Sequence, residues 1–171
     1  LSAAAFREGR HAQAFPSFGS ERTGAPVVSF CRIDDLPIRV HDPVAEPDAL
    51  IVQDVTLLRL GILDGLEPHG YLLVNSPRTP VGLGLAGAAQ ALPPGHLVTV
   101  PATELALTHV GRAVPNVPLL GAFAALTGLL SIDSVVAAIQ ERFAGPVARA
   151  NTAAARAAYV IVSEAGRAAA G

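Results

Sequence analysis

Three short apolar runs constrain the fold of this chain more than any other feature. Residues 49–53 and 70–75 are continuously apolar and end in a polar residue, and residues 96–100 form a third run of the same kind. Runs of this length without an alternating polar face are typical of strands buried on both faces of a parallel sheet. Ligands usually bind beyond the carboxyl ends of such strands. We therefore expect a mainly parallel sheet, with any ligand site at that edge.

The sequence after Ala102 has a helical pattern. Ser131 can cap a helix, and apolar residues then recur at the spacing of one helical face. These residues are Ile132, Val135, Val136, Ile139 and Phe143. Pro146 ends that helix and suits the first position of a last helix, which extends to about Gly166. The last helix consists almost entirely of small residues, so its buried face must pack closely.

Shorter elements are expected elsewhere. Residues 1–9 read as the tail of a helix, residues 25–33 and 36–41 as the strands of a hairpin, and residues 76–95 as a loop with one helical turn. No internal repeat or long linker divides the chain. We therefore expect a single three-layer α/β/α domain over residues 1–171, with a mainly parallel sheet and a helical C-terminus.

The charged residues exclude several classes of function. All 12 cationic side chains are arginine, so neither a lysine Schiff base nor a phosphate-loop lysine is available. The net charge of -2 gives no basic surface for nucleic acid or for an anionic membrane. The apolar stretches are interrupted well before the roughly 20 residues that span a bilayer. We expect neither nucleic acid nor a membrane as partner.

Cysteine and histidine usage bears on cofactors. Cys31 is the only cysteine, and an iron–sulfur cluster or a structural zinc needs about four ligands. The five histidines are scattered without metal-ligand spacing. We expect a cytoplasmic protein, because a lone cysteine suits a reducing compartment. We also expect that the chain holds no metal or cofactor by itself and has no catalytic residue of its own.

The most unusual segment lies between residues 13 and 27. It combines two aromatic residues, two prolines and two glycines with the adjacent charges of Glu21 and Arg22, and it resembles neither a helix nor a strand. A rigid loop of this kind, leading into a buried strand, can hold charged side chains in fixed positions for a ligand or a subunit. The alternative is a structural turn with an exposed ion pair, which contributes little.

The chain resembles the gamma component of pyruvate:ferredoxin and related 2-oxoacid oxidoreductases. The motif QAFPSFG at residues 13–19 carries much of the resemblance. Further matches occur in the expected order at residues 6–9, 21–22, 24–27, 37–39, 46–48, 52–54, 75–76, 102–103, 106, 111–112, 116, 120–123, 127–128, 139–143 and 151. Family members usually begin with a strand and a glycine-rich turn before the first helix. This chain starts partway through that helix, so we expect a domain that is truncated at its N-terminus.

The resemblance implies a multisubunit enzyme that uses thiamine diphosphate, iron–sulfur clusters and coenzyme A. Such an enzyme decarboxylates a 2-oxoacid, most commonly pyruvate, and passes electrons to ferredoxin. The implied partners are alpha, beta and ferredoxin-like delta subunits or their fused equivalents, and these hold the thiamine cofactor and the clusters. The gamma component is then expected to serve packing and substrate access.

Six residues are candidates for cofactor binding or for an interface. Gly19, Glu21, Arg22 and Gly24 belong to the unusual segment, where we expect positioning or subunit contact rather than acid–base chemistry. Asn75 follows a predicted strand and could contact a ligand, or it could satisfy local backbone groups. Asn116 could have a functional role, or it could cap the helix that contains Pro118.

Two other classes of protein also fit the pattern. One is a stand-alone α/β module that binds a nucleotide at the carboxyl edge of its sheet. The other is a structural interaction domain. An obligate subunit differs from both because it exposes a large apolar surface when it is isolated.

Overall fold

The computed structural model describes residues 1–17 and 27–170, with side chains as far as Arg167. The N-terminal elements are α1 (Ser2–Arg7), β1 (His11–Ser17) and β2 (Val28–Asp34). The central elements are β3 (Ala49–Val52), η1 (Val55–Leu60), β4 (Tyr71–Asn75), η2 (Val81–Leu83), α2 (Ala86–Ala91) and β5 (Leu97–Val100). The C-terminal part is helical, with α3 (Ala102–Val110), α4 (Asn116–Thr127), α5 (Ile132–Arg142) and α6 (Gly145–Ala170).

The three apolar runs form the parallel sheet that the sequence predicts. Its strand order is β3-β4-β5, and both strand pairs are parallel. Asp54 starts the first crossover, because its side chain accepts a hydrogen bond from the backbone N–H of Thr56 at 2.9 Å and caps η1. The α/β fold class with a mainly parallel sheet and a helical C-terminus is therefore confirmed.

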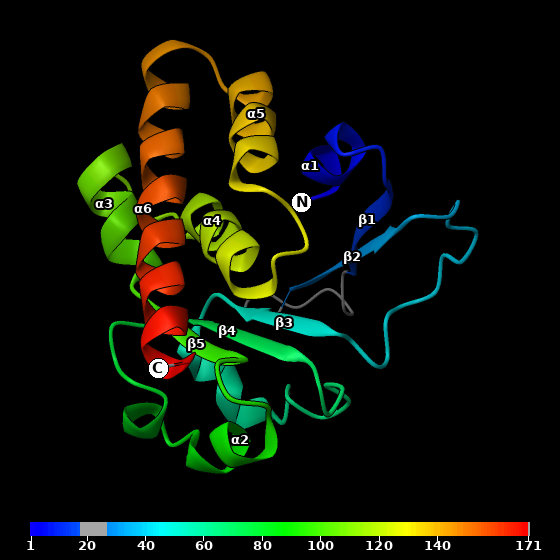
Figure 1. Cartoon of the computed structure of the whole chain (residues 1–171), viewed down its shortest axis with the longest axis vertical. Helices are drawn as coiled ribbons and strands as arrows, with labels where there is room; N and C mark the ends of the chain where they lie inside the picture. The colour runs from blue at the N-terminus through cyan, green and yellow to red at the C-terminus, as the bar shows by residue number, and fades with distance from the viewer. Residues whose placement is uncertain (18–26, 171) are drawn as a thin grey trace.

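Successive residues of β4 pack against different layers. Leu73 lies in one core with Val100 and residues of α4 and α6, whereas Leu72 and Val74 lie in another with Leu85. The second layer consists of η1, η2 and α2, which form the connections between the strands, and Figure 1 shows it below the sheet with the long helices above. The layer that opposes the long helices is thus thin.

Helices α4 and α6 cross at very short range. A Cβ atom built on Gly121 would lie 1.9 Å from the carbonyl oxygen of Ala155. Small residues on both helices allow this approach, among them Ala122 and Ala158, which are completely buried. The prediction that the last helix packs closely through small residues is therefore confirmed.

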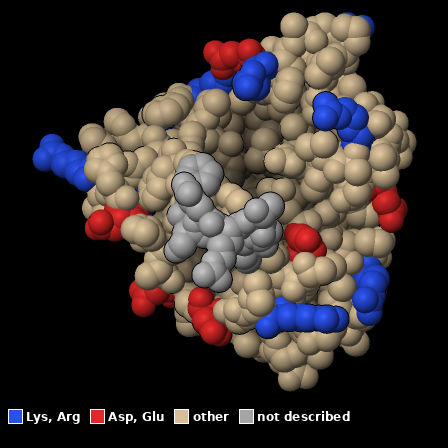
Figure 2. Space-filling model, turned by 180° about the vertical axis from the view of Figure 1, so that it is seen from behind, with Lys and Arg blue, Asp and Glu red and all other residues tan. Residues whose placement is uncertain are grey.

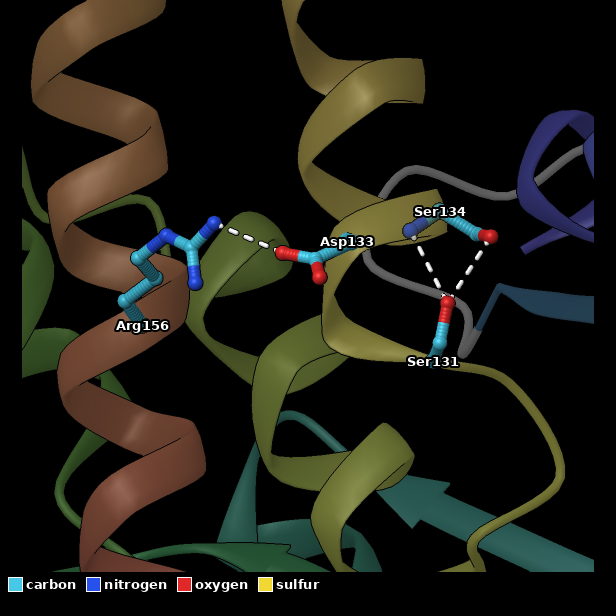
Figure 3. A network of polar contacts seen from close by, with 4 residues as sticks. All are labelled: Ser131, Asp133, Ser134 and Arg156. Atoms are coloured by element: carbon cyan, nitrogen blue, oxygen red, sulfur yellow. Dashed lines mark hydrogen bonds and ion pairs between the residues drawn. The ribbon is translucent and has the colours of Figure 1, made fainter.

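Helix α5 begins where the sequence predicts and is tied to two other helices. The hydroxyl oxygen of Ser131 accepts a hydrogen bond from the backbone N–H of Ser134 at 3.1 Å, and Asp133 forms an ion pair of 2.9 Å with Arg156 of α6 (Figure 3). The backbone N–H of Ser131 donates to the carboxylate of Glu8, just beyond α1, at 2.8 Å. The start of α5 is thus a junction of three helices.

The expected hairpin between residues 25–33 and 36–41 is wrong. Strand β2 pairs with β1, which precedes it, in an antiparallel two-stranded ribbon. The side chain of Asp34 accepts a hydrogen bond from the backbone N–H of Leu36 at 2.9 Å and turns the chain away. Pro37 then lacks the N–H that a ladder requires. Residues 35–48, which we call the strap, instead connect β2 to β3 without regular structure.

Two expectations about the unusual segment also need correction. Residues 14–17 were expected to be irregular but belong to β1, because Phe15 pairs across the ribbon with Phe30 and Pro16 is tolerated in a two-stranded edge. The following strand was expected to be buried, yet β2 is only half-buried or exposed along its length. Helix α1 and the strap cover only part of the faces of the ribbon.

The crossing of α4 and α6 generates a prediction for stability. We expect Gly121→Ala to lower the free energy of unfolding by about 3 kcal/mol, because its Cβ would overlap a backbone carbonyl that cannot move aside. Gly166→Ala on the exposed part of α6 is the matched control, since nothing lies within 4 Å of its added Cβ. That control should gain about 0.5 to 1 kcal/mol from helix propensity. Urea unfolding of both variants measures the difference, and equal stabilities would contradict the close crossing.

The junction at Ser131 generates a pH-dependent prediction. The hydrogen bond from the Ser131 backbone N–H is the main reason that the pKa of Glu8 lies below its ordinary value of 4.5. A lowered pKa in the folded state adds stability above the unfolded pKa, and this stability is lost as the pH falls through the folded pKa. Glu8→Gln should therefore be less stable than the wild type at pH 7, by less than about 1 kcal/mol at this exposed site. Urea unfolding should show the gap closing below pH 4.5, and a gap independent of pH would contradict the assignment.

Candidate functional site

Four of the six predicted residues lie outside the described part of the chain. Gly19, Glu21, Arg22 and Gly24 all belong to residues 18–26, which connect the two strands of the ribbon. Their predicted role in positioning or subunit contact therefore stays a prediction. The ribbon on either side of them in sequence is described.

The ribbon has an aromatic face that holds an arginine. The rings of Phe15 and Phe30 lie 5.5 Å apart between centroids, at a tilted angle. The guanidinium carbon of Arg32 lies 5.9 Å from the centroid of the Phe15 ring, within the range of a cation–π contact. These three residues alternate along their strands with others of the opposite face, as the pleat of a strand requires. The ribbon thus presents one face of large side chains.

The same face fixes the strap against the ribbon. Arg32 Nη2 donates a hydrogen bond to the carbonyl oxygen of Asp42 at 2.6 Å, and the side chain of Gln13 contacts Nδ1 of His41. Gln13 and Arg32 are themselves direct partners across the ribbon. An ion pair of 2.7 Å between Arg10 and Asp35 holds the start of the strap. A segment without regular structure is thereby held in one position.

Two polar atoms of this cluster are buried and lack a hydrogen-bond partner among the described residues. They are Oε1 of Gln13 and Nη1 of Arg32, an acceptor and a donor on neighbouring strands. Leaving such a buried atom unpaired costs about 1–3 kcal/mol. A water molecule or a neighbouring group that bridges these two atoms would remove that cost. The cluster is therefore suited to further polar contact.

Asn75 joins the carboxyl ends of the sheet. Its Nδ2 donates to the carbonyl oxygen of Gln53 at 2.9 Å and to the hydroxyl oxygen of Thr103 at 2.8 Å. Its Oδ1 accepts from the backbone N–H of Thr103 at 3.1 Å. Both N–H bonds of the amide are therefore used within the protein. This geometry supports the structural alternative for Asn75, with β3, β4 and the start of α3 fixed relative to one another.

Asn116 does not act as the predicted helix cap. It is the first residue of α4, and Pro115 occupies the cap position without a side-chain hydrogen bond. Its side chain is exposed. The backbone of Pro115 already has helical angles, and Pro115 has no N–H that would need a partner at the start of a helix. The helix therefore starts one residue earlier than it would if Asn116 were its cap. No hydrogen bond joins Asn116 to Asn75 in the described part of the chain.

Asp54 at the sheet edge, and Gln13 and Arg32 in the ribbon, were not selected as site residues from the sequence. Asp54 accepts hydrogen bonds from the backbone N–H and the hydroxyl of Thr56, and these hold the pKa of Asp54 below its ordinary value. The Asp-x-Thr spacing could have indicated this cap. Gln13 and Arg32 gave no such signal, because their contact depends on the register of the ribbon. Ser76, which is buried, accepts from the backbone N–H of Arg78 at 3.0 Å.

A cavity of about 380 Å³ lies away from Asn75 and Asn116. It opens between the start of β5 and the C-terminal ends of α4 and α6. Its lining is Gly95, Val98, Ala125, Leu126, Val162, Ser163, Gly166 and Arg167. Neither Asn75 nor Asn116 contributes to it. The back of the molecule is also hollowed, with mostly uncharged residues inside the hollow and charged residues around it (Figure 2).

The described residues were searched for metal-binding groups and for helices that could cross a membrane. Within residues 1–17 and 27–170, no group of three or more His, Cys, Asp or Glu side chains could hold a metal ion. None of the helices described is long and apolar enough to cross a bilayer. Fold and site together define an α/β domain in which a two-stranded ribbon lies beside a three-stranded parallel sheet.

Comparison with known proteins identifies the family. Residues 1–161 match the model of the pyruvate ferredoxin/flavodoxin oxidoreductase family. The chain is 42% identical over 160 residues to the pyruvate/ketoisovalerate oxidoreductases common subunit gamma of Thermococcus kodakarensis, covering 93% of this chain and 85% of that protein. It is 41% identical to the pyruvate synthase subunit PorC of Methanocaldococcus jannaschii, with coverages of 93% and 84%. The chain belongs to the pyruvate ferredoxin/flavodoxin oxidoreductase family.

A crystal structure agrees with this assignment. The pyruvate oxidoreductase subunit PORC of Thermotoga maritima superposes with a TM-score of 0.76 at 34% sequence identity. The match covers 93% of this chain and 84% of that subunit. The resemblance inferred from residues 13–27 and the later motifs is therefore confirmed.

The two asparagines generate a paired prediction. Asn75→Ala should lower the free energy of unfolding by about 2 kcal/mol, because it removes three hydrogen bonds and leaves partly buried groups unpaired. Asn116→Ala is the matched control and should change it by less than about 0.5 kcal/mol, since its side chain is exposed. Urea unfolding of the two variants provides the measurement. If Asn75→Ala is as stable as the wild type, the structural role of Asn75 is wrong.

Proposed function

We propose that this chain is the gamma component of a multisubunit 2-oxoacid:ferredoxin oxidoreductase, with pyruvate as its most common substrate. The complex would convert the 2-oxoacid and coenzyme A to acyl-CoA and CO2, and would reduce ferredoxin. The observation that carries the proposal is the 42% identity, over 93% of the chain, to a common gamma subunit of pyruvate and ketoisovalerate oxidoreductases. The shared fold with the PORC subunit supports it further.

The donor groups of the chain argue that companion subunits hold the iron–sulfur clusters. A cluster is bound by about four cysteine thiolates, and Cys31 is the only cysteine of the 171 residues. The residues present therefore do not fit a cluster within this chain. Thiamine diphosphate, which stabilises the carbanion formed on decarboxylation, would also be bound by companion subunits, as the family resemblance implies. A ferredoxin-like delta subunit would complete the set of partners.

The ribbon is the element best suited to packing against those partners. A two-stranded ribbon is marginally stable in water unless another element covers it. Helix α1 and the strap cover part of it through Ser2, Gln13 and Arg32, whereas Ala14, Pro16 and Ser29 stay exposed. A companion subunit that covers the exposed part would stabilise the ribbon. Glu21 and Arg22 would then act in positioning at that interface.

Omission and reconstitution test the proposed function. The purified companion subunits are assayed for pyruvate-dependent reduction of ferredoxin with and without this chain. We expect the chain to raise turnover by at least about tenfold, since positioning of reacting groups contributes effects of this size and larger. Equal turnover in both mixtures, together with no binding between them, would contradict the proposal.

The ribbon segment generates a more specific prediction. Replacing both Glu21 and Arg22 with alanine should lower turnover or assembly of the complex by about tenfold, while the stability of the chain changes by less than about 1 kcal/mol. Replacing both Arg59 and Asp64 with alanine is the matched control, because both of these charged side chains are exposed and lie outside the ribbon. Activity, size-exclusion chromatography and urea unfolding measure the effects. Unchanged turnover and assembly in the Glu21 and Arg22 variant would refute the assigned role.

A further inference from the structure

The strap has a defined conformation that neither secondary structure nor core packing explains. It comprises residues 35–48, and loops of this length without regular structure are uncommon in compact domains unless they have a function. Between Pro37 and Glu46, no backbone group takes part in a backbone–backbone hydrogen bond within the described part of the chain. Figure 1 shows the strap as an open arc that leaves β2 and returns to β3. Its shape is therefore not set by secondary structure.

Specific contacts nevertheless fix the strap along its length. Asp35 is paired with Arg10, His41 contacts Gln13, and the carbonyl of Asp42 accepts from Arg32. Near its end, the carbonyl oxygen of Ala45 lies so close to Gly65 that a Cβ there would be only 2.5 Å away. Ordering a loop costs conformational entropy. A surface that is ordered before binding avoids that cost when a partner binds.

The strap exposes apolar residues beside unpaired carboxylates. Leu36 is 71% exposed and Val40 is 52% exposed. Asp42, Glu46 and Asp48 are exposed, and their carboxylates make no hydrogen bond or ion pair with the described residues. Apolar contacts surrounded by a polar rim are the usual composition of a protein interface. The strap presents both parts on one short segment.

The charge of the strap indicates the chemistry of its partner. It contains four carboxylates and one arginine, a net charge of -3, whereas the whole chain has -2. The remainder of the chain is thus close to neutral at +1. Several acidic side chains gather on the side of the molecule that holds the strap (Figure 2). A second copy of the chain would bring two acidic straps together and would be repelled, whereas a basic surface would be attracted.

We propose that the strap is a docking surface for a companion subunit whose facing surface is basic. The apolar residues Leu36 and Val40 would be buried in the contact, and Asp42, Glu46 and Asp48 would pair with arginine or lysine side chains of that subunit. This inference rests on the proposed function, because it takes the partner from the same oxidoreductase complex. The strap would then be a second contact surface of the chain, besides the ribbon, and it carries a net charge of -3.

The test neutralises the three carboxylates in the assembled complex. A variant with Asp42→Asn, Glu46→Gln and Asp48→Asn is compared with a control variant that carries Asp64→Asn, Glu104→Gln and Glu164→Gln. The control removes the same charge from exposed residues outside the strap. The dissociation constant of the chain from the complex is measured by dilution and size-exclusion chromatography at about 50 mM and about 500 mM NaCl, because salt screens exposed charges.

The strap variant should bind about tenfold more weakly than the wild type at low salt, with a difference below about twofold at high salt. The control variant should bind like the wild type at both concentrations. Equal weakening of both variants would show an effect of net charge alone and would overturn the proposal. A strap variant that binds as tightly as the wild type would also overturn the proposal. That result would leave the proposed function intact, because the chain would still bind its companion subunits. If the wild-type chain binds no companion subunit at either salt concentration, the proposed function itself fails.

A second variant tests the apolar part of the surface. Replacing Leu36 and Val40 with serine should weaken binding by about tenfold at both salt concentrations, since apolar contacts are not screened. Unchanged binding would contradict a docked strap. Sedimentation of the isolated chain tests whether a second copy of the chain, and not a companion subunit, binds to the strap. We expect a monomer, and a dimer that the strap variant abolishes would show that a second copy binds there, which would overturn the proposal.

Discussion

The close crossing of α4 and α6 sets the position of nearly every other element. Gly121 lets the backbone of α4 approach the carbonyl of Ala155, and the buried face of both helices then packs on Leu73 and Val100 of the sheet. Helix α5 packs on α6 and is tied to it through Asp133 and Arg156. Because α1 packs on α5 and supports the ribbon, the position of the ribbon depends on a crossing that lies far from it in sequence. A larger residue at Gly121 would therefore move the candidate interface as well as the core.

The polar groups at the carboxyl edge of the sheet and those of the ribbon differ in how fully they are hydrogen-bonded. At the carboxyl edge of the sheet, the amide of Asn75 is used within the protein. At the ribbon, Gln13 and Arg32 each retain a buried atom without a partner among the described residues. The strap beside them exposes apolar and acidic side chains. The ribbon and the strap are suited to contact with neighbouring subunits. The internal hydrogen bonds of Asn75 argue against a nucleotide site at the sheet edge.

Much of the fold could be predicted from the sequence because local signals agreed with the tertiary structure. The apolar runs, the cap at Ser131 and the small residues of α6 each have one structural interpretation. The ribbon could not be predicted, since the register that pairs Gln13 with Arg32 joins residues far apart in sequence. A run of β-branched residues after Leu36 resembled a strand, but Pro37 and the turn at Asp34 prevented pairing. The hydrogen bonds between Asn75 and Thr103 could not be predicted either, because a strand-ending asparagine suits either a ligand or the backbone.

The central claim is that this chain functions as the gamma component of a larger oxidoreductase. Its most direct test is native mass spectrometry of the assembly isolated from the source cells through an affinity tag on this chain, combined with assays for iron and thiamine diphosphate. We expect a heteromeric complex that contains companion subunits, iron and thiamine diphosphate. Recovery of the chain alone as a stable monomer, with neither iron nor thiamine diphosphate, would contradict the account.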